Sequence, residues 1–311
     1  MNTYALISSF IFKVVIGSDN GTIEVYNANY TLIKSFQAHP NAIYRIKQSP
    51  FNNNNIATCS DESRVKIWTF NWTLIRTYNN HSNWVSGLEW INSDTIASGG
   101  DDSTIRIWSI STGITNRTIK AISFISCLKL LNNGYYLAAG LENNGSIVIY
   151  NIYTGMLITS LLGHTWYVND LVLINNGNLL ASSSSDFTVR IWDLNTNNTI
   201  SILTGHSAAV YGLKQISTDI LGSGSDDKTI KLWNITNGTL IRTLTGHTQT
   251  IYRSLDLLND GQTLVSGSYD KTIKSWNWTN GQCLQTISSS LFISSLAVLN
   301  QTTTSTSKRN F

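Results

Sequence analysis

The stretch "SGSDDKTIKLW" at residues 223–233 occurs in variant form seven times along the chain of 311 residues. Each copy ends in an aromatic residue, and these aromatics follow one another at intervals of 40–43 residues: Tyr26, Trp68, Trp108, Tyr150, Trp192, Trp233 and Trp276. A repeat of this length is typical of the four-stranded blades of a β-propeller. The spacing therefore predicts an all-β, seven-bladed propeller of antiparallel blades.

The sixth copy shows the four strands, a to d, that we expect in every repeat. They are predicted near Val210–Ile216, Ile220–Ser225, Thr229–Trp233 and Leu240–Leu244. The Asn-Gly pair at 237–238 lies between the last two strands, and such a pair between β-branched segments is a hairpin signal.

The two ends of the chain compete for one strand position. Residues 4–27 align without a gap on 211–234, which would make Tyr4–Ser8 strand a of the first blade and argues against a targeting signal. Residues 292–300 repeat the pattern of 124–132. They either replace Tyr4–Ser8 and close the ring, or begin an eighth unit of a longer protein. We expect one propeller over 1–300 and a disordered tail over 301–311.

Five copies share more than the terminal Trp. A Ser or Thr lies ten residues before the Trp, an acidic residue lies six before it, and a His precedes strand a. The five sets are His39, Thr58, Glu62 and Trp68; His81, Ser98, Asp102 and Trp108; His164, Ser182, Asp186 and Trp192; His206, Ser223, Asp227 and Trp233; and His247, Ser266, Asp270 and Trp276. This pattern closely resembles the WD-repeat family over about 300 residues.

The resemblance implies a buried hydrogen-bond relay in each of these blades. The Trp Nε1–H donates to the hydroxyl, the hydroxyl donates to one His nitrogen, and the other His N–H donates to the carboxylate. Such a satisfied network ties strands b and c to the loop before strand a. Glu62 is one methylene longer than Asp, which puts the relay of the second blade in question.

The first and fourth copies depart from the pattern. They end in Tyr26 and Tyr150, carry Ile16 and Gly140 at the Ser position, carry Asn20 and Asn144 at the acidic position, and lack the His. We expect apolar packing alone to hold these two blades and expect them to be the least stable.

The relay also bears on catalysis. A Ser-His-Asp set suggests acyl transfer, but in this chain it recurs in five repeats and uses all five histidines. Most arginines fall in strands c and d, so no arginine cluster or other polar cluster is predicted in the central channel. The Asp-rich turns lack the spacing of a calcium loop. The sequence predicts no enzyme, no cofactor and no metal site.

The composition of the chain limits the classes of partner and the cellular location that we expect. With 21 basic and 18 acidic residues the net charge is +3, which argues against a nucleic-acid surface. No apolar run approaches the roughly 18 residues of a membrane-spanning helix. The three cysteines, Cys59, Cys127 and Cys283, match no metal motif and are expected to be buried free thiols. We therefore expect a cytoplasmic protein, with a nuclear location as the alternative, and no membrane partner.

The family resemblance implies that partners dock on the face that carries the d–a and b–c loops, which we call the top face. Two sets of positions lie there. The first flanks the start of strand a: Tyr4, Tyr44, Trp84, Ser86, Phe124, Tyr167, Asn169, Tyr211 and Tyr252. The second directly precedes the acidic position: Asp19, Asp61, Asp101, Asn143, Ser185, Asp226 and Tyr269.

These sets are rich in Tyr and Trp, which dominate binding hot spots, and their only charges are acidic. They favour a Lys- or Arg-containing peptide segment, because aromatic faces and carboxylates both attract cations. The alternative is ordinary propeller surface with Asp in its usual turn positions. We expect a monomeric, non-catalytic protein-interaction scaffold. The second hypothesis is the substrate-recognition or sensor domain of a larger protein, such as a ubiquitin-ligase receptor or a signalling ATPase.

Overall fold

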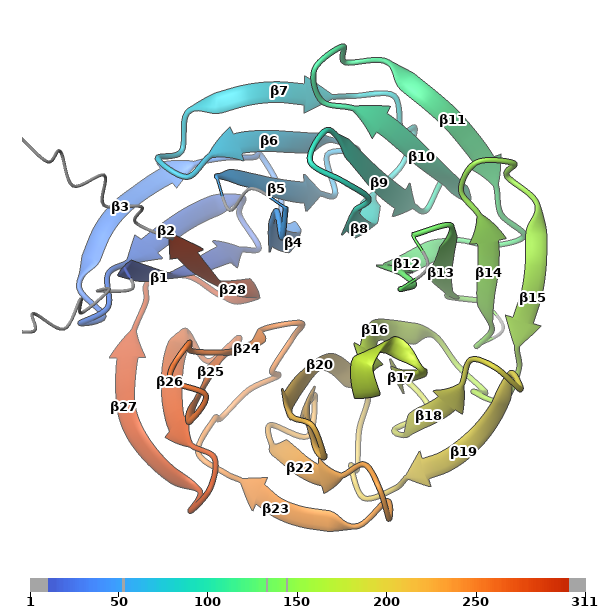
Figure 1. The fold of residues 1–311 in the computed structure, drawn as a ribbon. Coiled ribbons are helices and arrows are strands. Elements are labelled where there is room, and N and C mark those ends of the chain that lie inside the picture. Colours follow the sequence, from blue (N-terminus) through green and yellow to red (C-terminus); the bar gives the residue numbers. More distant parts are fainter. Residues whose placement is uncertain (1–10, 52–53, 133, 144, 302–311) are drawn as a thin grey trace, which may run out of the picture.

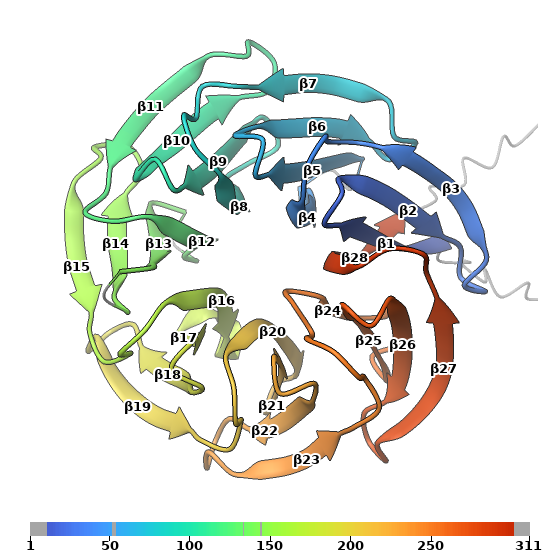
Figure 2. The same ribbon diagram turned by 180° about the vertical axis from the view of Figure 1, so that it is seen from behind.

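Seven four-stranded antiparallel sheets stand around a central channel in the computed structural model (Figures 1 and 2). The structure describes residues 11–51, 54–132, 134–143 and 145–301. Within these ranges the one helical element is a short 3-10 turn, η1 (Asn175–Gly177). The predicted all-β, seven-bladed propeller is confirmed.

The strands occupy four concentric positions in each blade. From blade one to blade seven, the inner strands are β28 (Ile293–Gln301), β4 (Ile43–Gln48), β8 (Val85–Trp90), β12 (Ile125–Leu130), β16 (Val168–Ile174), β20 (Val210–Ser217) and β24 (Leu255–Leu257). In the same order, the second strands are β1 (Ile11–Ser18), β5 (Asn55–Ser60), β9 (Thr95–Gly100), β13 (Tyr136–Leu141), β17 (Leu179–Ser184), β21 (Ile220–Ser225) and β25 (Thr263–Gly267).

The other two positions lie farther from the axis. The third strands are β2 (Thr22–Tyr26), β6 (Val65–Thr69), β10 (Thr104–Ser109), β14 (Ile147–Asn151), β18 (Val189–Asp193), β22 (Ile230–Asn234) and β26 (Thr272–Asn277). The outer strands are β3 (Leu32–Gln37), β7 (Leu74–Tyr78), β11 (Thr115–Lys120), β15 (Leu157–Leu161), β19 (Asn198–Leu203), β23 (Leu240–Leu244) and β27 (Gln282–Ser288).

Blade one is built from both ends of the chain. Its inner strand β28 pairs antiparallel with β1, from Ile11 opposite Gln301 to Gly17 opposite Ser295. The hypothesis that residues 292–300 close the ring is therefore correct, and the strand continues to Gln301, which the sequence assigned to the tail. Tyr4–Ser8 and residues 302–311 lie outside the described residues. Figure 1 shows β28 beside β1.

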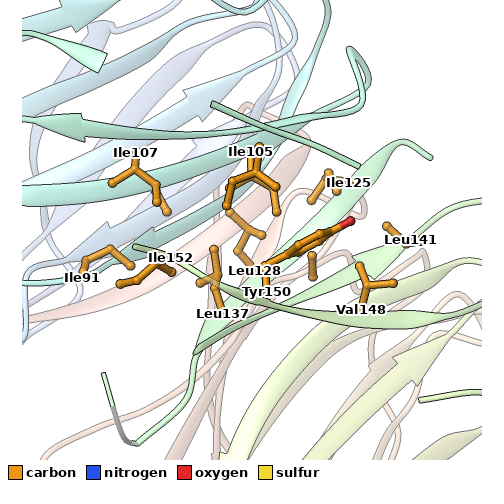
Figure 3. Close-up of a cluster of buried hydrophobic side chains, with 13 residues drawn as sticks. Ile91, Ile105, Ile107, Ile125, Leu128, Leu137, Leu141, Val148, Tyr150 and Ile152 are labelled. Atoms are coloured by element: carbon orange, nitrogen blue, oxygen red, sulfur yellow. The ribbon is translucent and has the colours of Figure 1, made fainter. Parts of the chain in front are cut away.

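The core is a ring of apolar layers between blades. Seven buried clusters occur in the described residues, and each joins side chains of two neighbouring blades. Figure 3 shows the layer between blades three and four, in which Ile105 and Ile107 of β10 face Leu137, Val148 and Tyr150. Because both faces of each blade are covered in this way, the second strands are almost fully buried.

Space near the axis selects small residues in the second strands. A Cβ added to Gly99 would lie 2.5 Å from the Ile125 side chain of the next blade. Such a contact is too close to exist, so blades three and four approach as they do because position 99 has no side chain.

Basic residues of the outer strands bridge neighbouring blades. Arg76 Nη2 donates to the Ser111 carbonyl at 3.1 Å, and Arg242 Nη2 donates to the Thr279 carbonyl at 3.2 Å. In both cases the acceptor lies in the turn after the third strand of the next blade. These arginines therefore serve contacts between blades at the rim.

Candidate functional site

The five predicted relays are each a continuous chain of hydrogen bonds. In blade three, Trp108 Nε1 donates to Ser98 Oγ at 2.7 Å, His81 Nε2 lies 2.7 Å from the same Oγ, and His81 Nδ1 lies 2.9 Å from Asp102 Oδ2. The corresponding distances in blades five, six and seven are 2.6–2.8 Å. The terminal Trp and His of these blades are buried. These groups therefore hold strands together and are closed to substrate.

The relay fixes the charge of its acidic residue. Burial alone would raise the pKa of Asp102, but hydrogen bonds from His81 and Thr104 lower it by more, so the carboxylate stays ionised. The pKa values of Asp186, Asp227 and Asp270 are lowered in the same way.

Blade two closes its relay despite the longer acid. His39 Nδ1 lies 2.5 Å from Glu62 Oε1, His39 Nε2 lies 2.7 Å from Thr58 Oγ1, and Trp68 Nε1 donates to Thr58 at 2.9 Å. Arg64 Nη1 lies 2.8 Å from the other Glu62 oxygen. The extra methylene is accommodated, so the expectation of a disturbed relay is wrong.

Blades one and four replace the relay in different ways. In blade one the Tyr26 hydroxyl donates to Glu24 Oε2 at 2.6 Å, and Ser289 Oγ donates to the same oxygen at 2.8 Å. Polar contacts therefore help to hold blade one, which corrects the expectation of apolar packing alone. In blade four Tyr150 lies within the apolar cluster of Figure 3, where burial raises its pKa.

In blade four, strand pairing assigns the top-face position to a different residue than the sequence spacing did. Leu141 pairs with Ile125 as Gly100 pairs with Val85, which makes Glu142 the structural equivalent of Asp101. Leu141 lies nine positions before Tyr150, whereas Gly100 lies eight positions before Trp108. Glu142 therefore takes the top-face position that the sequence assigned to Asn143. By the same pairing, Ala139 rather than Gly140 takes the Ser position.

A backbone hydrogen bond repeated in every blade joins the two sets of top-face positions. In six blades the N–H of the residue after the second strand donates to the carbonyl of the residue before the inner strand, and in blade seven Tyr269 donates to Thr250, the residue before Ile251. The seven pairs are Asp19–Phe292, Asp61–Ala42, Asp101–Trp84, Glu142–Phe124, Ser185–Tyr167, Asp226–Ala209 and Tyr269–Thr250. This bond places an aromatic side chain beside a carboxyl-bearing residue in blades one, three and four.

Half-buried and exposed aromatic rings form three groups on the top face, one of which is the pair Trp166 and Tyr167 with centroids 6.0 Å apart. Tyr211 and Tyr252 have centroids 4.7 Å apart, Tyr252 and Tyr269 5.8 Å, and Tyr269 and Phe292 6.3 Å. We call these four residues the aromatic arc. Phe292 takes part although the sequence did not single it out. In the second group Tyr44 and Trp84 have centroids 6.3 Å apart.

The predicted partner-binding residues differ in accessibility. Trp84, Phe124 and Tyr167 are 49%, 39% and 40% exposed. Ser86 and Asn169 are buried, and the Asn169 amide donates to Val210 O and to Ser185 Oγ. Ser86 and Asn169 are thus part of the interior, which corrects their assignment to the docking surface. Tyr4, proposed for the same surface, lies outside the described residues, and Ser294 takes its place beside Ile293.

The acidic top-face residues differ in environment as well. Burial raises the pKa of Asp101 to about 6, and the neighbouring Glu142 carboxylate adds to this effect. Asp101 Oδ1 is buried and has no hydrogen-bond partner. Burial also raises the pKa of Glu142. Asp226 is exposed and accepts a hydrogen bond from the Thr250 hydroxyl.

The channel wall carries a polar cluster that sequence reasoning missed. Arg45 Nη1 of β4 lies 2.9 Å from Asp170 Oδ1 of β16, and its Nη2 donates to the Asn169 carbonyl at 3.0 Å. Farther from the top face, Glu89 pairs with both Lys47 and Lys129, and Lys214 Nζ lies 2.5 Å from Asp256 Oδ1. These residues line a cavity of about 670 Å³ together with Arg253. The expectation of a channel free of polar clusters is therefore wrong.

The spacing of the charged channel residues along the inner strands could have revealed them from the sequence. Seven of the eight charged residues lie two or four positions after the apolar residue that opens strand a in the sequence: Arg45, Lys47, Glu89, Lys129, Asp170, Lys214 and Arg253. Asp256 lies five positions after Ile251, because blade seven has one extra residue before Leu255. The side chains of strand a point alternately to the channel and to the interface between blades. An even spacing therefore places these charged side chains on the channel side.

The remaining sequence expectations concern thiols, metals and membranes. Cys59 and Cys127 are buried free thiols, whereas Cys283 on β27 is exposed, which corrects the expectation for that residue. Among the described residues, His, Cys, Asp and Glu side chains do not gather in any group of three or more suited to a metal ion. The described part of the chain also has no helix with the length and apolarity needed to cross a membrane.

Seven four-stranded blades, five of them with a Trp–Ser/Thr–His–acid relay, define a WD-type propeller. The family model described as "WD domain, G-beta repeat" matches residues 30–69, 72–109, 155–193, 197–234 and 238–277, more than half of the chain. The chain therefore belongs to the WD40 repeat family. The matched stretches end at the five relay blades, and no match ends in blade one or blade four.

Similar proteins share only part of the chain. "WD repeat and SOCS box-containing protein 1" of Danio rerio and of Homo sapiens is 47% identical over 77 residues, which is 24% of this chain and 18% of the relative. "Periodic tryptophan protein 2 homolog" of Schizosaccharomyces pombe is 39% identical over 80 residues, which is 25% of this chain and 9% of the relative. The matched region thus spans less than a fifth of these relatives. WD40 propellers are generally non-catalytic interaction domains.

Proposed function

We propose that the top face binds a partner protein through a peptide segment that contains Lys or Arg. The observation that carries this proposal is the Asp101 carboxyl, whose Oδ1 is buried without a hydrogen-bond partner beside the exposed Trp84. A buried polar atom without a partner is unfavourable, and a donor from a ligand would relieve that cost.

The neighbouring blade repeats this arrangement. Glu142 is joined to the exposed Phe124 by the same backbone hydrogen bond that joins Asp101 to Trp84. The ionised carboxylates of Asp101 and Glu142 repel each other, and this repulsion contributes to the raised pKa of Asp101. An ammonium or guanidinium group between them would stabilise both, and the two aromatic rings would contact its aliphatic stem and its charge.

Two cations of the chain already contact aromatic rings of this face. Lys271 Nζ lies 4.4 Å from the centroid of Phe292, and Arg253 Cζ lies 5.2 Å from that of Tyr252. These contacts support the view that the aromatic positions of the top face suit basic groups. The rings of Trp84 and Phe124 remain open to solvent and are available to a ligand.

An array of degenerate decapeptides, each with one fixed residue, tests the proposal. We expect the wild-type chain to select Lys or Arg, and the Asp101→Asn/Glu142→Gln and Trp84→Ala variants to lose that selection. Asp219→Asn is the matched control, because Asp219 is exposed on the opposite face in the turn between β20 and β21. No selection for basic residues by the wild type, or selection unchanged in the Asp101/Glu142 variant, would contradict the proposal.

A second candidate is substrate recognition within a larger protein. It is favoured by the likeness of about a quarter of the chain to relatives named for a SOCS box. Affinity purification of the full-length gene product from its own cells tests it. Ubiquitin-ligase subunits that co-purify with both wild type and Trp84→Ala, together with a partner lost in the variant, would support it. A captured partner without such subunits would count against it.

A further inference from the structure

Arg253 interrupts the inner strand of blade seven. In the other six blades the inner strand begins at the first apolar residue after the loop, whereas β24 begins only at Leu255, four residues after Ile251. Arg253 has a φ of 48°, a left-handed conformation that disfavours a side chain. Strained residues of this kind are kept where the surrounding structure enforces them, and they cluster at functional sites.

The neighbouring blade makes room for this conformation. A Cβ on Gly212 of β20 would lie 3.3 Å from the Arg253 Cα. The absence of a side chain at 212 therefore lets the Arg253 backbone approach the inner strand of blade six.

The Arg253 side chain is buried with two of its donor nitrogens unused. The residue is 8% exposed, and neither Nε nor Nη1 has a hydrogen bond. It is the one arginine in the described residues with two such nitrogens. Arg45 on the same cavity wall is the contrast, because it is bonded to Asp170 and to the Asn169 carbonyl. A buried guanidinium needs acceptors, so the unused donors point to a ligand.

Arg253 lines the central cavity together with residues of the inner strands of all seven blades. Its charge acts on Tyr44, Asp101, Glu142, Tyr211 and Tyr269, which come from five different blades. It also contacts the Tyr252 ring of the aromatic arc. A group that enters the channel from the centre of the top face would therefore meet Arg253.

We propose that Arg253 binds a carboxylate of the peptide that docks on the top face, either an Asp or Glu side chain or the peptide's own C-terminus. This inference rests on the proposed function and adds an anionic anchor to it. A carboxylate suits the site better than a phosphate dianion, because a single guanidinium offers two unused donors and three carboxyls, those of Asp101, Glu142 and Asp170, act on the same region. The bound segment would then carry a basic group over blades three and four and an acidic group at the channel.

A set of decapeptides with one fixed Lys tests the inference. In this set Glu, Gln or phosphoserine is placed at each of the other positions in turn, and every peptide is made with a free C-terminal carboxylate and with a C-terminal amide. We expect the wild-type chain to prefer Glu over Gln at one position, or acid over amide, by about tenfold in Kd measured by fluorescence anisotropy. Arg253→Gln should bind the charged and neutral peptides equally. Arg117→Gln, on the outer strand β11, should retain the wild-type preference.

The wild-type comparison needs no variant, so the test holds even if Arg253→Gln does not fold. Equal binding of all charged and neutral pairs by the wild type, an acidic preference retained by Arg253→Gln, or a preference for phosphoserine over Glu would each overturn the inference. Failure of the proposed function would be a different result, namely that the wild-type chain binds peptides with and without the fixed Lys equally well. Asp101→Asn/Glu142→Gln should weaken the requirement for Lys and still distinguish Glu from Gln.

Discussion

Arg45 and Asp170 form an ion pair of 2.9 Å although they belong to blades two and five, which are three blades apart in the ring. Both side chains are largely buried, and Asp170 Oδ2 also accepts a hydrogen bond from the Leu213 backbone N–H of blade six. Three blades are thus linked through one carboxylate inside the channel. This contact is independent of the apolar layers, which join only neighbouring blades.

Arg45→Met should lower the free energy of unfolding by about 3 kcal/mol, because it leaves the Asp170 carboxylate buried without its cation. The double variant Arg45→Met/Asp170→Leu should recover part of that loss, since neither charge then remains. Urea denaturation of the single and double variants gives both values. A double variant less stable than the sum of the two single effects would contradict this account.

Trp233→Phe should lower stability by about 1–3 kcal/mol, because it removes the indole donor from Ser223 Oγ, which also bonds His206 in the buried relay. Tyr150→Phe should cost less, since Tyr150 lies in an apolar cluster outside any relay. Thermal unfolding of the two variants compares them directly. Equal losses would mean that the relay adds nothing beyond packing.

Asp101→Asn should stabilise the protein at neutral pH. Its pKa is about 6 in the folded chain against 3.8 as the ordinary value, so ionisation above pH 6 costs folding free energy that the variant avoids. For this half-buried group we expect a gain of about 1 kcal/mol at pH 7. The gain should shrink as the pH falls from 6 to 4 and vanish below 4, where the carboxyl is protonated in both states. Urea midpoints at pH 7 and pH 4 provide the measurement.

A gain in stability together with a loss of Lys or Arg selection in the same variant would mark Asp101 as a binding residue retained at a cost to the fold. If the urea midpoint of Asp101→Asn is below that of the wild type at pH 7, the carboxyl is instead serving the structure.

Cys283 should react with a thiol reagent in the folded protein, and Cys59 and Cys127 should not. Burial shields the latter two and raises their pKa values to about 12 and about 11, whereas Cys283 is exposed. Mass spectrometry after brief iodoacetamide treatment identifies the labelled residues, with the denatured chain as the control. Equal labelling of all three in the native protein would contradict the described burial.

The sequence predicts the blades and the relay because both depend on local periodicity. Residues equivalent to Ser223, Asp227 and Trp233 recur at one spacing in every relay blade. Glu142 escaped prediction because blade four has one extra residue between its second strand and Tyr150, and only strand pairing reveals the shift. The ion pair between Arg45 and Asp170 depends on closure of the ring, which brings together side chains 125 residues apart. Arg253 depends on a backbone conformation that its residue type disfavours.

The pairing of β28 with β1 also has a consequence for synthesis. A ribosome completes Ile11–Ser18 before the other described strands, but the partner strand emerges only after residue 293 has been made. Until then blade one lacks its inner strand, and the buried residues Val14, Val15 and Ile16 have no neighbour on that side. Contacts between such distant segments form slowly, so the nascent chain carries an unpaired apolar edge through most of its synthesis. Of the described strands, the one made earliest is therefore among the last to be sheltered, and we expect chaperones to bind this edge in the nascent chain.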